Sequence, residues 1–167
     1  MLISGNIHNV SLYMHYAHIW AKTLGSDEKV KFEFSISDRY RKVELIVWGI
    51  ISFVLLLLRT TFWFSTGIIT FLIALFYYGY YLRVANAYAF TNKRVLIHRG
   101  WLSTHTISVD YPKITDIHIT EPMSERFITH TGNLAIITAG STSDQIVLRH
   151  VKDPYEIKKQ LDVLKDG

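Results

Sequence analysis

The feature that most limits the fold of this chain is an apolar run from Leu45 to Leu82, in which Arg59 is the only charged residue. A single helix over this run would be ~57 Å long, whereas the hydrocarbon core of a bilayer is only about 30 Å thick. Two antiparallel helices fit that thickness far better. We therefore expect a transmembrane hairpin within residues 43–82, with helices near Val43–Thr60 and Ser65–Leu82.

Aromatic and basic residues flank this run as they do in membrane proteins. Trp63, in the expected turn Thr61–Phe64, would lie at one interface, and the tyrosines between Tyr77 and Tyr81 would lie at the other, because amphipathic rings favour headgroup depth. Basic residues concentrate outside the run, at Lys29, Lys31, Arg39, Arg41 and Lys42 before it and at Arg83, Lys93, Arg94 and Arg99 after it. The positive-inside rule then predicts a protein of the cell (plasma) membrane with two spans and both termini cytoplasmic.

Two other structures are compatible with such a run. A soluble protein would have to cover both helices on every side, which a chain of 167 residues can hardly do. A re-entrant hairpin, which dips into the bilayer without crossing it, stays open because both expected helices are near the short end of the spanning range. The lipid bilayer is the expected partner in either membrane form.

The first 25 residues form a separate arm, in which Asn9–Leu24 is expected to be an amphipathic helix. Its wide apolar face suits a membrane interface or a partner, and equally suits docking on the chain's own domain. His8, His15 and His18 lie on its polar stripe, and the last two are one turn apart, as metal ligands can be. No acidic residue accompanies them before Asp27, so a solvated stripe is favoured and no metal site is expected.

Beyond the arm, apolar residues alternate with a period of two, which is typical of half-buried strands. Residues 26–42 hold one such strand pattern, Val30–Ser37, followed by a basic segment before the hairpin; this strand is a candidate to join a later sheet. Residues 83–167 hold six more strands, at Tyr88–Thr91, Arg94–His98, Thr104–Tyr111, Ile114–Thr120, Leu134–Thr138 and Gln145–Val151. Asp153 and Pro154 then begin a final helix. The expected fold is an α+β membrane protein: a two-helix transmembrane hairpin, then an antiparallel β sandwich or open barrel capped by the C-terminal helix.

Several short motifs in this domain occur in an order that resembles a known family. They are Tyr88–Arg94, Gly100, the isoleucine-rich pair Ile107–Ile119, the glycine-led strand Gly132–Ile136 and the closing Asp153-Pro154. In this order, and behind a two-helix hairpin, they are similar to bacterial pleckstrin-homology (PH) domain membrane proteins of the YdbS type. The resemblance covers most of the chain from about Asp27 onward. It implies a PH-like domain that binds a peptide, a protein partner or lipid headgroups.

Motifs for catalysis are missing from the sequence. It has no phosphate-cradling glycine loop, no dinucleotide fingerprint, no HExxH and no GxSxG, and it has no cysteine for a thiolate metal site or a nucleophile. We therefore expect a non-enzymatic protein without a cofactor. The net charge of +4 is modest and its charges are interleaved, so nucleic acid is not an expected partner.

Lys93, Arg94 and Arg99 are the candidate residues for binding headgroups or a partner, because a basic residue beside an anionic leaflet gains about 1 kcal/mol. The alternative is that they only set the topology. A second functional hypothesis is an accessory or structural subunit of a larger membrane complex, or a homo-oligomer, that assembles through the hairpin. Small residues permit close helix approach there, at Gly49, Ser52, Gly67, Ala74 and Gly79.

Overall fold

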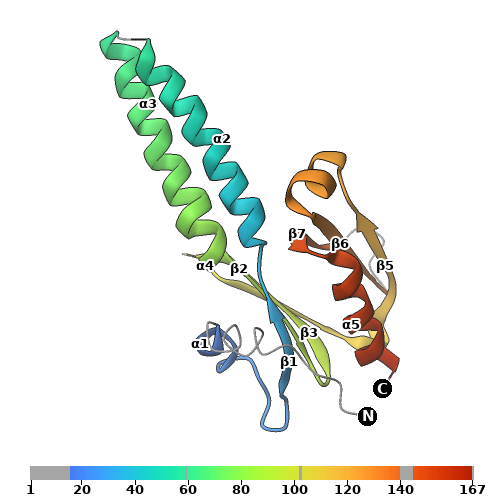
Figure 1. Ribbon diagram of the computed structural model, residues 1–167. Helices are drawn as coiled ribbons and strands as arrows, with labels where there is room; N and C mark the ends of the chain where they lie inside the picture. Colours follow the sequence, from blue (N-terminus) through green and yellow to red (C-terminus); the bar gives the residue numbers. More distant parts are fainter. Residues whose placement is uncertain (1–15, 59, 102, 140–144, 167) are drawn as a thin grey trace, which may run out of the picture.

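The structure is a computed structural model that describes residues 16–58, 60–101, 103–139 and 145–166. A β domain forms one end of the molecule, and a pair of long helices projects away from it (Figure 1). The β domain contains two antiparallel sheets, one of four strands in the order β1-β2-β3-β4 and one of three in the order β5-β6-β7. The strands are β1 (Val30–Phe34), β2 (Asn86–Thr91), β3 (Arg94–Arg99), β4 (His105–Asp110), β5 (Ile114–Thr120), β6 (Thr131–Thr138) and β7 (Ile146–Lys152).

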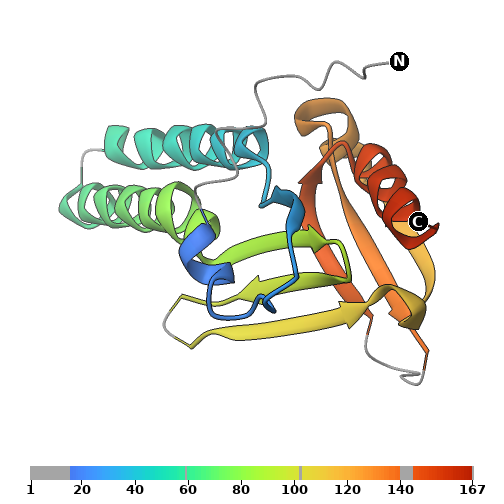
Figure 2. The ribbon, with the colours of Figure 1, turned by 90° about the horizontal axis from the view of Figure 1, so that it is seen from below.

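All the strands expected from alternation are present, and the first of them closes the fold. β1 pairs antiparallel with β2, so that Phe34 lies opposite Tyr88 and the strand before the helices neighbours the strand after them. Helix α5 (Pro154–Asp166) follows β7 and lies beside the second sheet (Figure 2). The prediction of PH-like antiparallel sheets with a C-terminal helix is therefore confirmed.

One core fills the space between the two sheets and α5. Inward-facing residues of the first sheet, such as Phe90 and Ile97, meet Leu134 and Leu148 of the second, and Leu161 of α5 joins them. These side chains are fully buried. Burying a large aliphatic or aromatic side chain contributes about 1.5–3 kcal/mol, so this core is what holds the two sheets together.

The N-terminal arm is docked on the outer face of the first sheet, which decides between the two expected roles for its described part. Tyr16 and Trp20 are buried against Ala87, Ala89 and Leu96, and the small alanines leave room for the aromatic rings. Helix α1 (Ala17–Trp20) is the only helix in the described part of the arm, so the expected helix ends at Trp20 rather than at Leu24. The earlier part of that expected helix, with His8 and His15, lies outside the described residues.

The helical pair begins and turns earlier than expected. Helix α2 (Asp38–Leu57) starts five residues before Val43, because the charged residues ahead of the apolar run are also helical. Thr60 caps the second helix, with its Oγ1 accepting from the Trp63 amide at 3.4 Å. The turn therefore precedes Thr61 instead of occupying Thr61–Phe64. The second helix is continuous through α3 (Thr61–Ala74), the π-helical stretch η2 (Leu75–Tyr81) and α4 (Leu82–Ala85).

Of the two long helices, one meets the requirements for crossing a membrane by length and composition. This helix is Thr61–Ala85, and only 11% of its apolar window is buried. α2 does not meet them, because its first two turns carry Asp38, Arg39, Arg41, Lys42 and Glu44. The expectation of two crossing helices is thus supported for the second helix alone.

Arg41 joins the bases of the two helices. Its Nη1 donates to the carbonyl oxygens of Tyr78 and Gly79, at 3.4 and 3.2 Å. These carbonyls belong to η2, where the π-helical pattern shifts the backbone bonds away from the α-helical ladder. Arg41 also pairs with Asp38, so this buried guanidinium fixes the start of α2 against the π-helical stretch of its neighbour.

A second ion pair holds the loop before β1 to the β2–β3 turn. Glu28 accepts from Arg94 twice, through Nε at 2.9 Å and Nη2 at 2.8 Å, and from the Thr91 hydroxyl at 2.8 Å. The hydrogen bonds from Arg94, followed by the smaller effects of Thr91 and the Gly25 amide, outweigh the cost of burial and lower the Glu28 pKa from 4.5 to about 2. The pair is thus a structural element of the first sheet.

We expect Gly67→Leu to push the two helices apart. A Cβ at Gly67 would lie 3.0 Å from the Ser52 carbonyl oxygen and 3.2 Å from the Leu56 side chain, and overpacking of this kind costs about 1–3 kcal/mol. Unfolding of the purified protein in mixed micelles with increasing dodecyl sulfate, followed by circular dichroism, measures the loss. Gly49→Leu is the matched control, since a Cβ there meets nothing within 4 Å. Equal losses in both variants would contradict the packed contact.

We expect Glu28→Gln to destabilise the β domain by about 2–3 kcal/mol at neutral pH, because it leaves a largely buried guanidinium without its counter-charge. The folded-state pKa of Glu28 is depressed, so its contribution is complete above pH 4.5 and is lost as the pH falls toward 2. Thermal unfolding of both proteins across this range should converge at the acidic end. Asp110→Asn, which removes the exposed partner of Lys113, should cost less than about 1 kcal/mol. If the stability of wild type and of Glu28→Gln changed with pH in the same way, the proposed contribution of the Glu28 carboxylate would be refuted.

Candidate functional site

A cleft opens between the two sheets where their edges diverge. β4 is the last strand of the first sheet and β7 the last of the second, and in the described chain neither strand has a second strand partner. The cleft encloses about 580 Å³, which is within the usual size of a ligand-binding pocket. Its lining residues are Arg99, His105, Ile107, Ser108, Val109, Lys113, Thr138, Ala139, Gln145 and Ile146.

The cleft has a basic rim and an apolar floor. Arg99 ends β3, His105 begins β4, and Lys113 lies in the short 3₁₀ turn Tyr111–Lys113 that links the two sheets. Ile107 and Ile146 are partly buried beneath them. None of the described lining residues is acidic, so the cleft favours a ligand that combines negative charge with apolar groups.

The basic side chains that line the cleft differ in how firmly other groups hold them. Arg99 donates from Nη2 to the backbone carbonyl of Val147, which ties the end of β3 to β7. His105 is exposed. Lys113 pairs with Asp110 at 2.8 Å, but both side chains are largely solvated, and an ion pair of this kind is weak. His105 and Lys113 can therefore turn toward a bound ligand, whereas Arg99 is held in place.

The structure does not bring the three sequence-predicted residues together. Arg94 is held by Glu28 and also donates to the Thr23 carbonyl at 3.1 Å. Lys93 is exposed in the β2–β3 turn, and β2 runs to this turn from its junction with α4 (Figure 1). Lys93 and Arg94 therefore lie at the end of the sheet farthest from the helical pair. Arg99, at the opposite end of β3, is the one of the three that lines the cleft.

His105 and Lys113 were missed by sequence reasoning. They are eight residues apart and lie on different elements, and nothing in their spacing marks them as neighbours. They meet at one cleft only because the second sheet folds back over the first. The signal that was available is the alternation in β4, which places His105 on the same face of the strand as Ile107 and the buried Val109.

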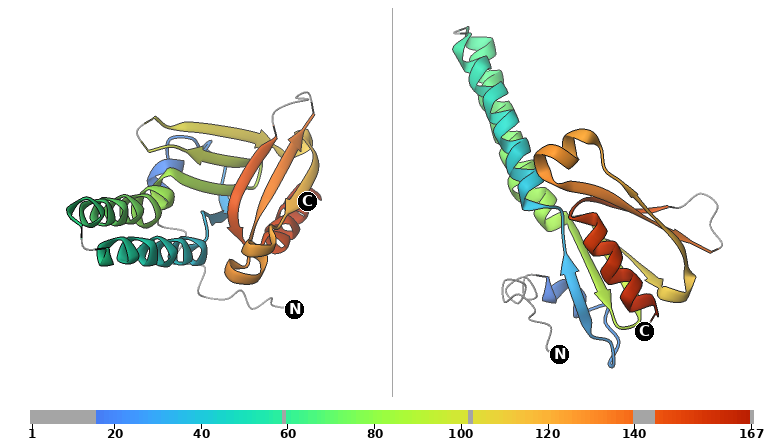
Figure 3. Two further views of the ribbon diagram at one scale, coloured as in Figure 1. Left: turned by 90° about the horizontal axis from the view of Figure 1, so that it is seen from above. Right: turned by 45° about the vertical axis from the view of Figure 1, so that its right-hand side comes forward.

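The surface of the helical pair is a second candidate site, of a different kind. Large apolar side chains are exposed along both helices, including Ile46 at 62%, Phe62 at 69% and Ile73 at 63%. Soluble monomeric proteins rarely expose a continuous apolar surface of this extent. The helical pair projects away from the sheets (Figure 3), so the β domain cannot cover most of its length.

The described residues contain no group of three or more histidine, aspartate or glutamate side chains that could hold a metal ion. His18, the one histidine of the expected polar stripe that the structure describes, is exposed. His98 lies in the first sheet beside Trp20, with their ring centroids 6.3 Å apart. Burial, with a smaller effect from His18, lowers the pKa of His98, which favours its neutral form beneath the arm.

One family model and several solved structures are similar to this chain. The family model described as "Bacterial PH domain" matches residues 29–165. A DUF1696 family protein with a pleckstrin-homology domain from Shewanella loihica PV-4 is similar in structure, with 15% identity and a TM-score of 0.49 over 96% of this chain and 99% of that one. A pleckstrin-homology domain from Shewanella amazonensis SB2B matches with 12% identity and a TM-score of 0.49, over 90% and 96% of the two chains. None of the curated proteins matches. Because the family model spans most of the sequence, the chain belongs to the bacterial PH domain family.

Proposed function

We propose that this protein is a non-enzymatic binding module, anchored in the cell membrane by its helical pair, with its PH-like domain on the cytoplasmic face. The observation that carries the proposal is the apolar surface of the helices, which is exposed away from the contact between them. The helices project away from the hydrophobic clusters of the described β domain (Figure 1). Contact with lipid tails is energetically favourable for such an apolar surface, whereas contact with water is unfavourable.

The packing of the two helices supports a double crossing, although α2 alone is too charged to qualify. α2 lies along α3, with Ser52 and Gly67 buried at their contact. If the second helix crosses the bilayer, the tip next to Leu58 and Thr60 reaches the far side, and α2 must return with it. The charged turns of α2 and Arg83 then lie at the cytoplasmic interface, where long basic side chains can extend to the headgroups.

The open cleft is the binding site that we propose for the domain. Its partner is an extended segment of another protein in which acidic and apolar residues alternate. The edges of β4 and β7 that have no strand partner in the described chain offer backbone groups to an added strand. Ile107 and Ile146 offer an apolar floor, Lys113 offers positive charge, and His105 offers a ring N–H donor. Headgroup binding by Lys93 and Arg94 is less well supported, because Arg94 is engaged by Glu28 and both lie far from the helices.

A second candidate function is that of a subunit assembling through the hairpin. Gly49 and Gly79 have nothing within 4 Å of a Cβ position, so each leaves a gap in the outer surface of its helix where another helix can approach closely. Ser52, Gly67 and Ala74 are already buried. This function predicts a stable membrane partner that is lost when Gly49 and Gly79 are replaced by leucine.

Two added cysteines test the topology, because the natural chain has none. Thr61→Cys, at the tip of the pair, should react with a membrane-impermeant maleimide in intact cells. Gln160→Cys, exposed on α5, should react only after the membrane is opened. The cysteine-free parent is the background control. If the reagent reached neither site until lysis, the hairpin would not cross, and a re-entrant form would take its place.

A short acidic peptide tests the cleft. We expect a fluorescent peptide of alternating glutamate and valine to bind the purified protein, and the double variant His105→Glu, Lys113→Glu to weaken binding by at least about tenfold, or ~1.4 kcal/mol. Fluorescence anisotropy measures both. Reversing two exposed charges away from the cleft, Lys152→Glu and Lys159→Glu, should have little effect. Equal weakening by both pairs, or no saturable binding, would refute the cleft as the site.

A further inference from the structure

The connection between β5 and β6 exposes a group of large apolar side chains that the fold does not use. Met123 is 76% exposed, Phe127 68% and Ile128 53%. Phe127 and Ile128 lie in the π-helical turn η4 (Glu125–Thr129), and Met123 lies just before it. We call residues 122–129 the β5–β6 loop. Apolar residues this exposed are unusual in a short loop whose neighbouring strands are well packed.

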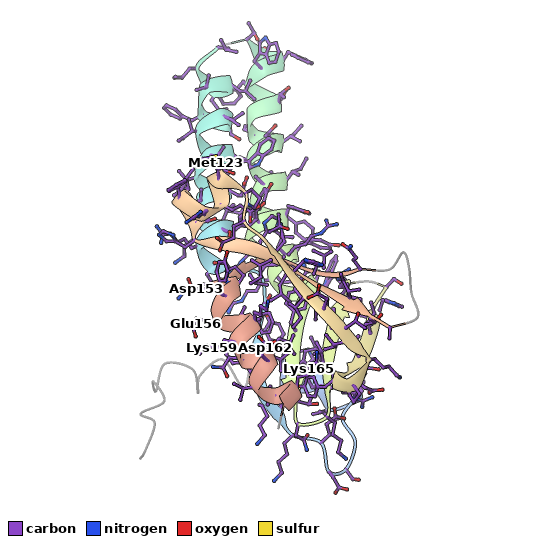
Figure 4. The ribbon with its side chains drawn as sticks, turned by 90° about the vertical axis from the view of Figure 1, so that its right-hand side faces the viewer. Met123, Asp153, Glu156, Lys159, Asp162 and Lys165 are labelled. Carbon is purple, nitrogen blue, oxygen red and sulfur yellow. The ribbon has the colours of Figure 1, made fainter. Side chains whose placement is uncertain are left out.

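The β5–β6 loop lies beside the base of the helical pair. η4 contacts α2, and the loop rises along the first turns of α2 in the direction of the helix tips (Figures 1 and 3). Met123 is at the end of the β domain nearest the helices, whereas Lys165 of α5 is at the far end (Figure 4). The loop therefore reaches the level at which the apolar surface of the helices begins.

The loop is held rigidly in this place by polar contacts beneath it. Oε2 of Glu125 lies 3.1 Å from Nδ1 of His150, and it accepts from the Thr131 hydroxyl at 3.2 Å. The imidazole of His150 stacks on the ring of Tyr40 in α2, with centroids 3.9 Å apart and planes within 9°. Thr129 donates to the Glu125 carbonyl at 2.9 Å. The apolar side chains thus project from a fixed support, so their exposure is a property of the fold.

A second loop reaches the same end of the helical pair. Trp101, in the connection between β3 and β4, packs edge-on against Phe76 and Tyr80 of the second helix, with centroids 5.8 and 5.9 Å apart. It is 41% exposed. Tryptophan and tyrosine favour headgroup depth, so Trp101 and Tyr80 mark the level of the interface on one helix, as the β5–β6 loop does on the other.

We propose that the β5–β6 loop inserts Met123, Phe127 and Ile128 into the headgroup–acyl boundary of the leaflet in which the helices are based. This inference rests on the proposed membrane anchoring. Arg126, whose guanidinium carbon lies 5.9 Å from the Phe127 ring centroid, is exposed and can reach lipid phosphates from the same turn. The loop and Trp101 contact the bilayer on either side of the helical pair, and together they fix the tilt of the PH-like domain.

Nitroxide labels on single cysteines test this insertion. The full-length protein carries one label at Phe127→Cys, Met123→Cys, Val163→Cys or Ile69→Cys, in vesicles of phosphatidylcholine and phosphatidylglycerol. Val163 is the matched control, since it is 66% exposed on the distal half of α5, and Ile69 reports on the helical pair itself. Power saturation compares collisions with oxygen, which partitions into lipid, against collisions with a water-soluble nickel chelate.

We expect the oxygen-to-nickel ratio at Phe127→Cys and Met123→Cys to exceed that at Val163→Cys several-fold, and to lie below that at Ile69→Cys. If Ile69→Cys is in lipid while both loop labels match Val163→Cys, the insertion is overturned and the anchoring stands. If Ile69→Cys is itself exposed to nickel, the anchoring fails and the insertion fails with it. Loop labels shielded from both reagents and coupled between copies would show a protein contact, which also overturns the insertion.

Discussion

The two connections between the β domain and the helical pair are short and hydrogen-bonded. The arrangement of the molecule depends on this constraint. α4 passes into β2 without an intervening loop, because Ala85 ends the helix and Asn86 begins the strand. The Gly100 amide donates to the Ala85 carbonyl at 2.8 Å. On the other side, the Ser37 amide donates to the His150 carbonyl at 2.9 Å just before α2 begins. The direction of the helices is therefore transmitted directly to both sheets.

Under the proposed membrane anchoring, this rigidity gives the PH-like domain a defined face toward the bilayer. The β3–β4 and β5–β6 connections lie at the bases of the helices, where Trp101 packs against Phe76 and η4 contacts α2. The β2–β3 turn lies at the opposite end of the domain (Figure 1). Arg41 has a central part in this arrangement, since it joins the start of α2 to the carbonyls of the π-helical stretch. A domain on a flexible tether would sample many orientations, whereas this one holds its cleft in a single orientation relative to the helical pair.

The elements of the fold follow from local patterns, and most of them could be predicted from the sequence. Alternation located the strands, and the nearly uncharged run located the helices. The start of α2 was set too late because its charged turns look like a separate segment, although Arg41 is needed inside the helix to reach the second one. The docking of the arm on Ala87 and Ala89 could not be predicted, because a strand that is buried on both faces gives no sign of what covers it.

The site was harder to predict than the fold, because it depends on contacts between distant parts of the chain. In the sequence Arg94 is a plausible ligand for headgroups, but in the structure its guanidinium is bound by Glu28, which lies 66 residues away in the chain. The cleft exists only where the edges of two sheets diverge. The role proposed for the β5–β6 loop depends on its position beside α2. Neither relation leaves a periodic trace in the sequence.

The central claim, that the helical pair is embedded in lipid with the domain at one surface, is tested most directly by the four tryptophans of the chain. Variants that each keep one tryptophan, reconstituted with lipids brominated at different depths, report where each ring lies. The account predicts that Trp48 is quenched most deeply, that Trp63 and Trp101 are quenched near the interfaces, and that Trp20, buried between the arm and the first sheet, is not quenched. If Trp48 were quenched no more than Trp20, the helices would not be in the bilayer and the account would be wrong.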